Sequence, residues 1–255
     1  MATVTDFFTY LDQRAPFALQ MDFDNAGFLV GRGDGEVTRV LVALDITRAV
    51  VDEAADLGAQ LIVSHHPVIF HPVRSLTDGD STGRTLMALV KQDIAAICLH
   101  TNLDLAAGGV NDALAAAVGL TDTAPLTGEG LGRVGRLEAP WAPADYAARV
   151  KRALGAAGLR WTQGRGMVRS VAVGGGACGD LLAAAHGACC DAFVTSDVKY
   201  DVFLEADALG VTLIDAGHFP TENVVCPVLA DWLREGFPQV EVLYTQRHRE
   251  VIAYL

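Results

Sequence analysis

Two adjacent histidines, His65 and His66, follow the short apolar run Leu61–Val63 and precede Pro67. An apolar run of this length, bounded by polar residues, predicts a buried β-strand. Open α/β sheets place their ligand sites at the carboxyl ends of their strands. Because imidazole is the commonest side chain that binds transition metals, this pair is a candidate metal site.

Two later segments carry similar chemistry, each directly after another apolar run. The first contains His100 and Asp104, and the second contains His218 and Glu222. We predict Pro220 as the first residue of a helix, so His218 and Glu222, four positions apart, should face the same way. A mixed set of imidazole and carboxylate donors suits Zn, Mn, Fe or a similar divalent metal.

Each of these segments also has an ordinary interpretation. A lone histidine at a strand end is usually a polar residue satisfied by hydrogen bonds, and a histidine four positions before a glutamate is common by chance. Three such segments, each after a similar run, favour a metal site over coincidence. Because carboxylates can bridge, five donors suffice for two metals with positions left for water: His65, His66, Asp104, His218 and Glu222.

Strands and helices alternate along the chain, which predicts an α/β fold with a mostly parallel or mixed sheet in each half. Residues 121–130 are polar and contain glycine and proline, so we place the boundary between two lobes there, at 1–125 and 126–255. Segments 40–66 and 171–200 show the same order of elements. Two similar lobes would enclose the metal site in a cleft.

We predict strands at 37–44, 61–64, 94–99, 133–137, 168–173, 192–195, 211–214, 240–244 and 251–254. We predict helices at 4–13, 47–57, 84–92, 110–118, 143–156, 179–186, 198–209 and 220–235. Each predicted metal donor thus follows the end of a strand or lies at the start of a helix.

The segments SHHPVIF, LHTNLD and DAGHFPTE, in this order, resemble the dinuclear-metal-centre family of toroidal hexamers. Many members of that family are labelled type 2 homologues of GTP cyclohydrolase I. Residues 24–27 and 194–200 are similar to two further motifs of the family. The resemblance extends from about Phe7 to Leu255 and implies a short form of the family, without the inserted middle domain of longer members.

The resemblance implies that the five donors bind two divalent metal ions per chain, with Asp104 and Glu222 as bridging ligands. It also implies a homohexameric ring and a small-molecule substrate of nucleotide type, with ring opening of GTP by water at C8 as the labelled reaction. Asp201 stands where many members carry a histidine. The role of Asp201 in substrate contacts therefore stays open.

Three further candidates have two interpretations each. His100 is either a residue that orients a ligand or transfers a proton, or a buried histidine satisfied by the backbone. Asp45 is either a general base or hydrogen-bond acceptor for a ligand histidine, or the N-cap of the helix that begins near Thr47. The segment Gly174–Gly179 either cradles an anion on its backbone amides or makes a tight turn for close packing.

Composition limits the remaining function classes. The chain has 255 residues, 51% hydrophobic content and a net charge of −12, so it can bury a sizeable core and its surface disfavours nucleic acid. It contains no apolar stretch of membrane-spanning length and no visible signal peptide. Five cysteines without a CxxC motif fit a reducing compartment. We therefore expect a cytoplasmic protein.

Two function classes fit these features. The first is a metal-dependent hydrolase, and the second is a non-catalytic hexameric scaffold or regulator that binds metal. An open metal position with a base nearby is typical of the first, and a closed site is typical of the second. His100 and Asp45 favour catalysis.

Overall fold

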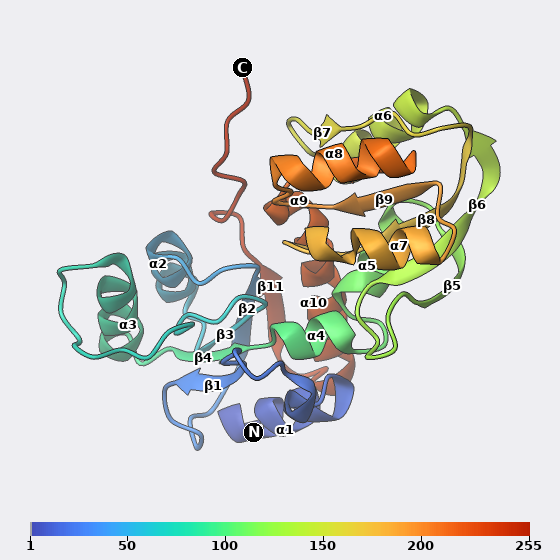
Figure 1. Ribbon diagram of the computed structural model, residues 1–255. Coiled ribbons are helices and arrows are strands. Elements are labelled where there is room, and N and C mark those ends of the chain that lie inside the picture. Colours follow the sequence, from blue (N-terminus) through green and yellow to red (C-terminus); the bar gives the residue numbers. More distant parts are fainter. Residues whose placement is uncertain (1) are drawn as a thin grey trace. The chain divides into compact units, whose positions relative to one another are not determined.

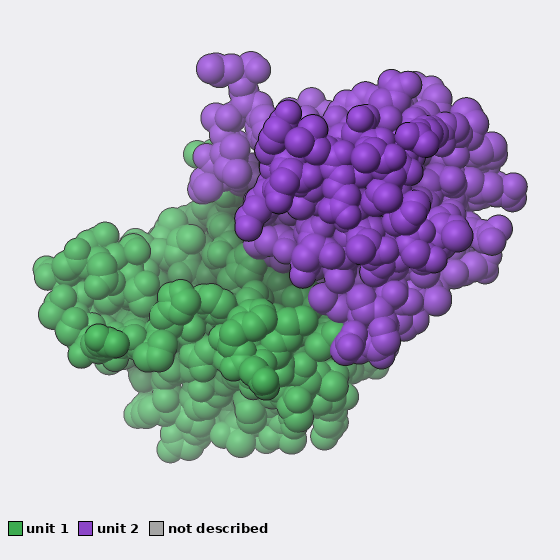
Figure 2. All heavy atoms as spheres, viewed as in Figure 1, with its two compact units in different colours: residues 1–106, 226–249 green, residues 107–225, 250–255 purple. Residues whose placement is uncertain are grey.

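The computed structural model describes residues 2–255, which divide into two compact units (Figures 1 and 2). Unit 1 contains the chain up to Ala106 together with residues 226–249, and unit 2 contains residues 107–225 and 250–255. Each unit has its own mixed β-sheet with helices packed on it. The predicted α/β class with two mixed sheets is therefore confirmed.

The sheet of unit 1 has the order β1-β4-β3-β2-β11. Its four strands β4, β3, β2 and β11 are parallel, and β1 is an antiparallel edge strand. Parallel pairing places the carboxyl ends of β3 and β4 side by side, so the residues after each strand meet at one edge of the sheet. The strands are β1 (Gly27–Val30), β2 (Arg39–Ala43), β3 (Leu61–Ser64), β4 (Ala95–Cys98) and β11 (Glu241–Tyr244).

Helices α2 (Arg48–Leu57) and α3 (Ser81–Lys91) cover one face of this sheet, where Val50 and Leu89 pack on alternate strand residues. Helix α1 (Val4–Arg14) packs against the end of α10 (Val225–Gly236), with the rings of Phe7 and Phe237 stacked at 3.8 Å. The short elements η1 (Phe17–Leu19) and α4 (Thr101–Leu105) complete unit 1.

Local signals account for the ends of these helices. The Thr3 side chain accepts from the Asp6 amide, and the Asp6 carboxylate accepts in return from the Thr3 amide, which forms a capping box for α1. Thr47 caps α2, and Gly58 ends it at a φ of 67°, a left-handed conformation that glycine adopts without strain. Helix α3 begins at Ser81, three residues before the predicted start at Arg84. The reason is that the Asp80 side chain caps the helix by accepting a hydrogen bond from the Gly83 amide.

The sheet of unit 2 has the order β5-β6-β8-β9-β10-β7, with β8, β9 and β10 parallel and the other pairings antiparallel. The strands are β5 (Thr121–Pro125), β6 (Arg133–Trp141), β7 (Arg160–Trp161), β8 (Val168–Val173), β9 (Ala192–Thr195) and β10 (Thr212–Asp215).

Helices lie on both faces of the second sheet (Figure 1). Helices α5 (Val110–Ala117) and α6 (Pro143–Ala153) pack on one face, and α7 (Leu182–Gly187) and α8 (Tyr200–Leu209) on the other. The central strands β9 and β10 are therefore buried on both faces of the sheet. Two short helices, η2 (Gly179–Leu181) and α9 (His218–Glu222), follow the strand ends.

The buried side chain of Arg133 on β6 connects the sheet of unit 2 to α5. Its guanidinium donates to both carboxylate oxygens of Asp112, at 2.6 and 2.9 Å, and to the carbonyls of Gly130 and Gly132. Burial alone would raise the pKa of the Asp112 carboxyl. The hydrogen bonds from Arg133 and from the Gly108 amide, together with the positive charge of Arg133, outweigh burial and lower that pKa.

Several elements differ from their predictions. Residues 107–125 pack with unit 2 and residues 226–249 return to unit 1, so the structural division does not follow a boundary at 125/126. Residues 251–254 form no strand, because they pair with none of the described strands. The expected helix 220–235 is two helices, α9 and α10. No helix within residues 2–255 is long and apolar enough to span a membrane.

Candidate metal centre

Three histidines converge at the carboxyl ends of β3 and β4 in unit 1. One ring nitrogen from each of His65, His66 and His100 lies within 4.8 Å of the others. His65 is fully buried, and the other two are half-buried. The ring centroids of His65 lie 4.9 Å from His66 and 5.3 Å from His100. Three imidazoles at this spacing can act as ligands of one metal ion.

The second ring nitrogen of each histidine is held by an oxygen atom. The Nδ1 atoms of His66 and His100 lie 2.7 Å from the carboxylates of Asp45 and Asp24, and His65 Nδ1 lies 2.8 Å from the Leu99 carbonyl. Because these oxygens only accept, each Nδ1 carries the proton and each Nε2 keeps its lone pair. This is the orientation that metal-binding histidines usually have.

Asp24 holds His100 from the segment before β1. Its side chain is fully buried and also accepts hydrogen bonds from the backbone amide and the hydroxyl of Thr101. Burial raises the pKa of the Asp24 carboxyl, but the hydrogen bonds from His100 and Thr101 outweigh it and hold that pKa well below its usual range. His100 is thus satisfied by a carboxylate and not by the backbone.

Asp45 is an acceptor for histidine and not a helix cap. Thr47 caps α2, whereas the two carboxylate oxygens of Asp45 lie 2.7 Å from His66 Nδ1 and 3.2 Å from His248 Nε2. The side chain of His248 is 8% exposed. Burial lowers the pKa of His248, although the neighbouring Asp45 carboxylate opposes this.

No sequence pattern marked His248, which lies in the segment after β11. Buried Glu53 on α2 places this segment: its carboxylate accepts hydrogen bonds from the hydroxyl of Thr245 and from the amides of Gln246 and Arg247. The contact joins residues almost 200 positions apart, so only folding reveals it.

Replacing Asp45 by asparagine should weaken metal binding about 10- to 100-fold, the usual effect of losing the acceptor behind a ligand histidine. The amide accepts less strongly and can turn its NH₂ group toward His66 Nδ1. Competition with a chromophoric chelator would measure the affinity. The control is Asp231→Asn on α10, an exposed residue that pairs with Arg234. Equal affinity in the Asp45 and Asp231 variants would contradict the role given to Asp45.

Asp104 lies on α4, one turn after His100, with its Oδ1 3.8 Å from His65 Nε2. Unit 1 therefore supplies three of the five predicted ligands: His65 and His66, which group with His100, and Asp104, which lies near His65. Among residues 2–255, no group of clustered donor atoms contains a cysteine. Burial raises the pKa of the nearby Cys98 thiol to about 11, which keeps it protonated.

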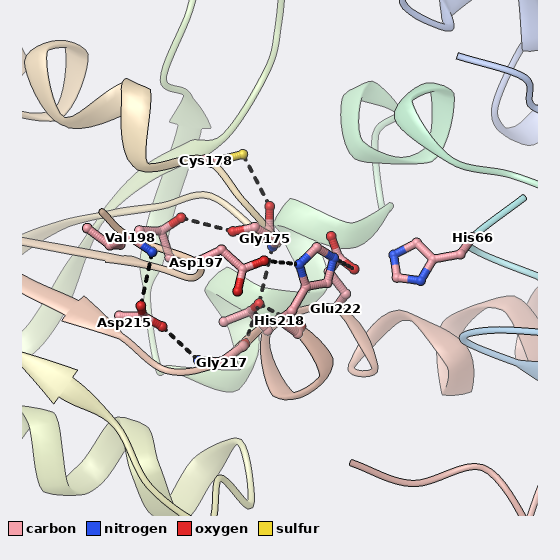
Figure 3. A network of polar contacts seen from close by, with 12 residues as sticks. His66, Gly175, Cys178, Asp197, Val198, Asp215, Gly217, His218 and Glu222 are labelled. Carbon is pink, nitrogen blue, oxygen red and sulfur yellow. Dashed lines mark hydrogen bonds and ion pairs between the residues drawn. The ribbon is translucent and has the colours of Figure 1, made fainter. Parts of the chain in front are cut away.

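Unit 2 supplies the remaining two predicted ligands (Figure 3). His218 Nε2 lies 3.0 Å from Glu222 Oε2, and His218 Nδ1 lies 2.7 Å from Asp197 Oδ2. The prediction that the two residues share a face is confirmed. Pro220 is the third helical residue and not the first, since α9 begins at His218. Proline is tolerated there because first-turn amides have no intrahelical partner.

The glycine loop after β8 makes room for Glu222. The amide of Gly175 donates to Asn111 Oδ1 and the amide of Gly176 donates to Thr221 Oγ1, so these amides are already used within the unit. A Cβ atom at Gly176, whose φ is 65°, would overlap Glu222 Oε1. The tight-turn interpretation of Gly174–Gly179 is therefore favoured over an anion cradle.

Asp201 lies at the start of α8 and is exposed, as are Lys199 and Tyr200 before it. None of the donor groups found among residues 2–255 includes these side chains. The structure therefore gives Asp201 no contact with the metal donors of its own unit.

The fold and the oriented donors define an α/β protein of two mixed sheets with side chains able to hold metal. The chain belongs to the Duf34/NIF3 (NGG1p interacting factor 3) family, whose model matches residues 2–250. It is 37% identical to a Streptomyces coelicolor protein named GTP cyclohydrolase 1 type 2 homolog, over 92% of this chain and 87% of that protein. A Clostridium perfringens protein of the same name is 30% identical over 99% of both chains.

Solved structures agree with this assignment. A Staphylococcus aureus hypothetical protein superposes with a TM-score of 0.94 at 29% identity, covering 99% of both chains. A Bacillus cereus protein related to NIF3 superposes with a TM-score of 0.95 over 100% of this chain and 99% of that chain. At 24% identity, the second likeness concerns the fold alone.

Proposed function

We propose that this protein binds two divalent metal ions per chain and uses them to hydrolyse a small molecule of nucleotide type. The observation that carries the proposal is the common orientation of the three proposed ligand histidines, His65, His66 and His218, each with Nδ1 held by an oxygen. Orienting three rings in this way serves metal binding, because it directs each Nε2 toward a metal. The proposed ligands are His65, His66, Asp104, His218 and Glu222.

The donor set fits borderline divalent metals. Three imidazole nitrogens and two carboxylates suit Zn, Mn or Fe, and too few oxygens are present for Ca²⁺. In each unit a histidine Nε2 is paired with a carboxylate, at 3.8 Å in His65–Asp104 and 3.0 Å in His218–Glu222. Asp104 and Glu222 are the proposed bridging ligands because only carboxylates in this set readily span two metals.

A bound divalent metal would supply an activated water near neutral pH and would polarise the bond under attack. The chain's own residues would then move the protons. We assign proton transfer to His100, which is half-buried, is oriented by Asp24 and is not needed as a ligand. Asp45 fixes the ring of His66 and helps to keep its Nδ1 protonated.

GTP is the first substrate to test, because the relatives that this chain matches are named GTP cyclohydrolase 1 type 2 homologs. Water would attack C8 of the purine and open its five-membered ring to a formamide, and a second water would hydrolyse that formamide and release formate. Formate and absorbance would be followed with metal-reconstituted wild type beside Glu222→Ala. Turnover in the wild type that is lost in the variant supports the proposal. No turnover at full metal occupancy rejects GTP, and leaves another hydrolytic substrate or a non-catalytic metal-binding ring.

We also propose that the chain assembles as a homohexamer, as the family resemblance implies. The exposed Tyr200 and Leu204 lie one turn apart on α8 and offer apolar surface that an assembly would cover. Light scattering coupled to size exclusion would give the mass in solution. A mass of one or two chains at micromolar concentration would contradict this assembly.

A further inference from the structure

Unit 1 contains a polar pocket of about 330 Å³, and the candidate metal ligand His66 is one of the residues that line it. The pocket lies between the start of α2, the segment after β3 and the start of α3. Asp45, Ile46, Pro67 and Val68 are among the residues that line it. Its volume is at the lower end of the roughly 300–1,000 Å³ typical of ligand pockets, which suits a small polar group.

Two arginines and several hydroxyl groups line this pocket. Arg48 comes from α2 and Arg84 from α3, and the hydroxyls belong to Thr47, Ser81, Thr82 and Thr85. Arginine presents a planar set of N–H donors that matches the oxygens of a phosphate group, and hydroxyls supply further donors. The donors come from two helices far apart in sequence, so the pocket is a product of the fold.

The charges of the lining favour an anion. Arg84 donates to the Asp78 carbonyl and forms no ion pair within the part of the chain that the structure describes. Arg48 is paired with Asp52 at 2.8 Å, but both side chains are about half exposed, so water screens the pair. Asp45 is the single carboxylate of the lining, and it is shared by His66 and His248.

Two arginines and one carboxylate, Asp45, line this pocket on a chain whose net charge is −12. Acidic proteins repel anions over most of their surface. Two arginines in one pocket beside a candidate metal ligand therefore mark a place where an anion can bind. His66 is both a proposed metal ligand and a residue of the pocket lining, so the two sites would be adjacent. A group bound by Arg48 and Arg84 would therefore lie next to the reacting centre.

We propose that this pocket binds the phosphate group of the substrate, with Arg48 and Arg84 as its principal ligands. This inference rests on the proposed hydrolase function and specifies its substrate class: phosphorylated small molecules should bind better than their dephosphorylated counterparts. The role given to both arginines is positioning, because they hold a part of the substrate that does not react at the metal.

The test uses the full-length protein and inorganic phosphate as the probe. Metal also binds phosphate, so binding is first measured by calorimetry on chelator-treated protein and then repeated after metal is restored. The variants are Arg48→Gln, Arg84→Gln and both together. Arg74→Gln is the control, since Arg74 is exposed in the segment between β3 and α3 but lines a different pocket. Thermal unfolding checks that each variant folds.

Saturable phosphate binding to metal-free wild type, weakened at least tenfold in the double variant and unchanged in Arg74→Gln, is the expected result. Absence of saturable binding would overturn the inference, as would equal binding by the wild type and the double variant. Saturable binding that Arg74→Gln weakens as much as the double variant does would also overturn it. Metal content is measured on the same samples, so failure of the metal proposal is seen separately from failure of the phosphate site.

Discussion

Glu222→Gln is expected to lower the affinity for metal by roughly 100-fold or more. Loss of an outer partner of a ligand already costs about 10- to 100-fold, and Glu222 is proposed as a direct and bridging ligand. Glutamine keeps the shape of the side chain beside Gly176, so the packing of α9 should survive. Metal content per chain after dialysis and a competitive chelator titration would measure the effect.

The control for this variant is Glu205→Gln on the exposed side of α8. A second variant, Gly176→Ala, keeps the carboxylate but places a methyl group against Glu222 Oε1. It should also weaken metal binding, because Glu222 must move. Full metal occupancy in Glu222→Gln, with an affinity equal to that of Glu205→Gln, would remove Glu222 from the ligand set.

Asp112→Ala is expected to lower the free energy of unfolding by about 3 kcal/mol. Removing one partner of a buried ion pair leaves an uncompensated charge, which typically costs roughly 3–5 kcal/mol. The lower end applies because the Asp112 side chain is 29% exposed and because Arg133 keeps its bonds to two carbonyls. Urea denaturation at pH 7 would give the difference.

The matched control is Asp231→Ala, which breaks the exposed pair with Arg234 and should cost less than about 1 kcal/mol. The pH dependence gives a further check. The folded pKa of Asp112 is lowered, so its stabilisation is present above the unfolded value of about 3.9 and is lost as pH falls through the folded value. The gap between wild type and variant should shrink below about pH 4. A gap that persists there would argue against the ion pair as its cause.

Local patterns predicted most of the core elements. Strands at 61–64, 168–173 and 192–195 have the predicted bounds. The first and third are short runs buried at every residue, and the second is buried from Val171 to Val173. The polar composition of residues 121–125 predicts a boundary between lobes, yet they form edge strand β5 through pairing with β6. All five are exposed, so no hydrophobic pattern marked them.

The reverse error occurred at residues 251–254, where apolar side chains predicted a strand. Val251 is 89% exposed and Ile252 is 50% exposed, and no described strand pairs with either. Strand formation depends on a partner as much as on propensity, and the partner is not visible in the local sequence.

By itself the sequence determined which side chains can bind metal and where they lie along the chain. His65, His66, Asp104, His218 and Glu222 follow predictable strand ends, because apolar runs and their polar boundaries are local signals. Tertiary structure alone decided how the rings are held. The acceptors Asp24 and Asp45 lie 76 and 21 positions from the histidines they orient. His248, which contacts Asp45, lies about 200 positions after it in the sequence.

Tertiary structure alone also formed the proposed phosphate pocket and returned the C-terminal segment 226–249 to unit 1. Arg48 and Arg84 meet only because α2 and α3 pack on one face of the sheet. Residues 226–249 join unit 1 because β11 pairs in parallel with β2, about 200 positions earlier. Such contacts depend on strand pairing and helix packing between distant segments, which no local pattern of residues encodes.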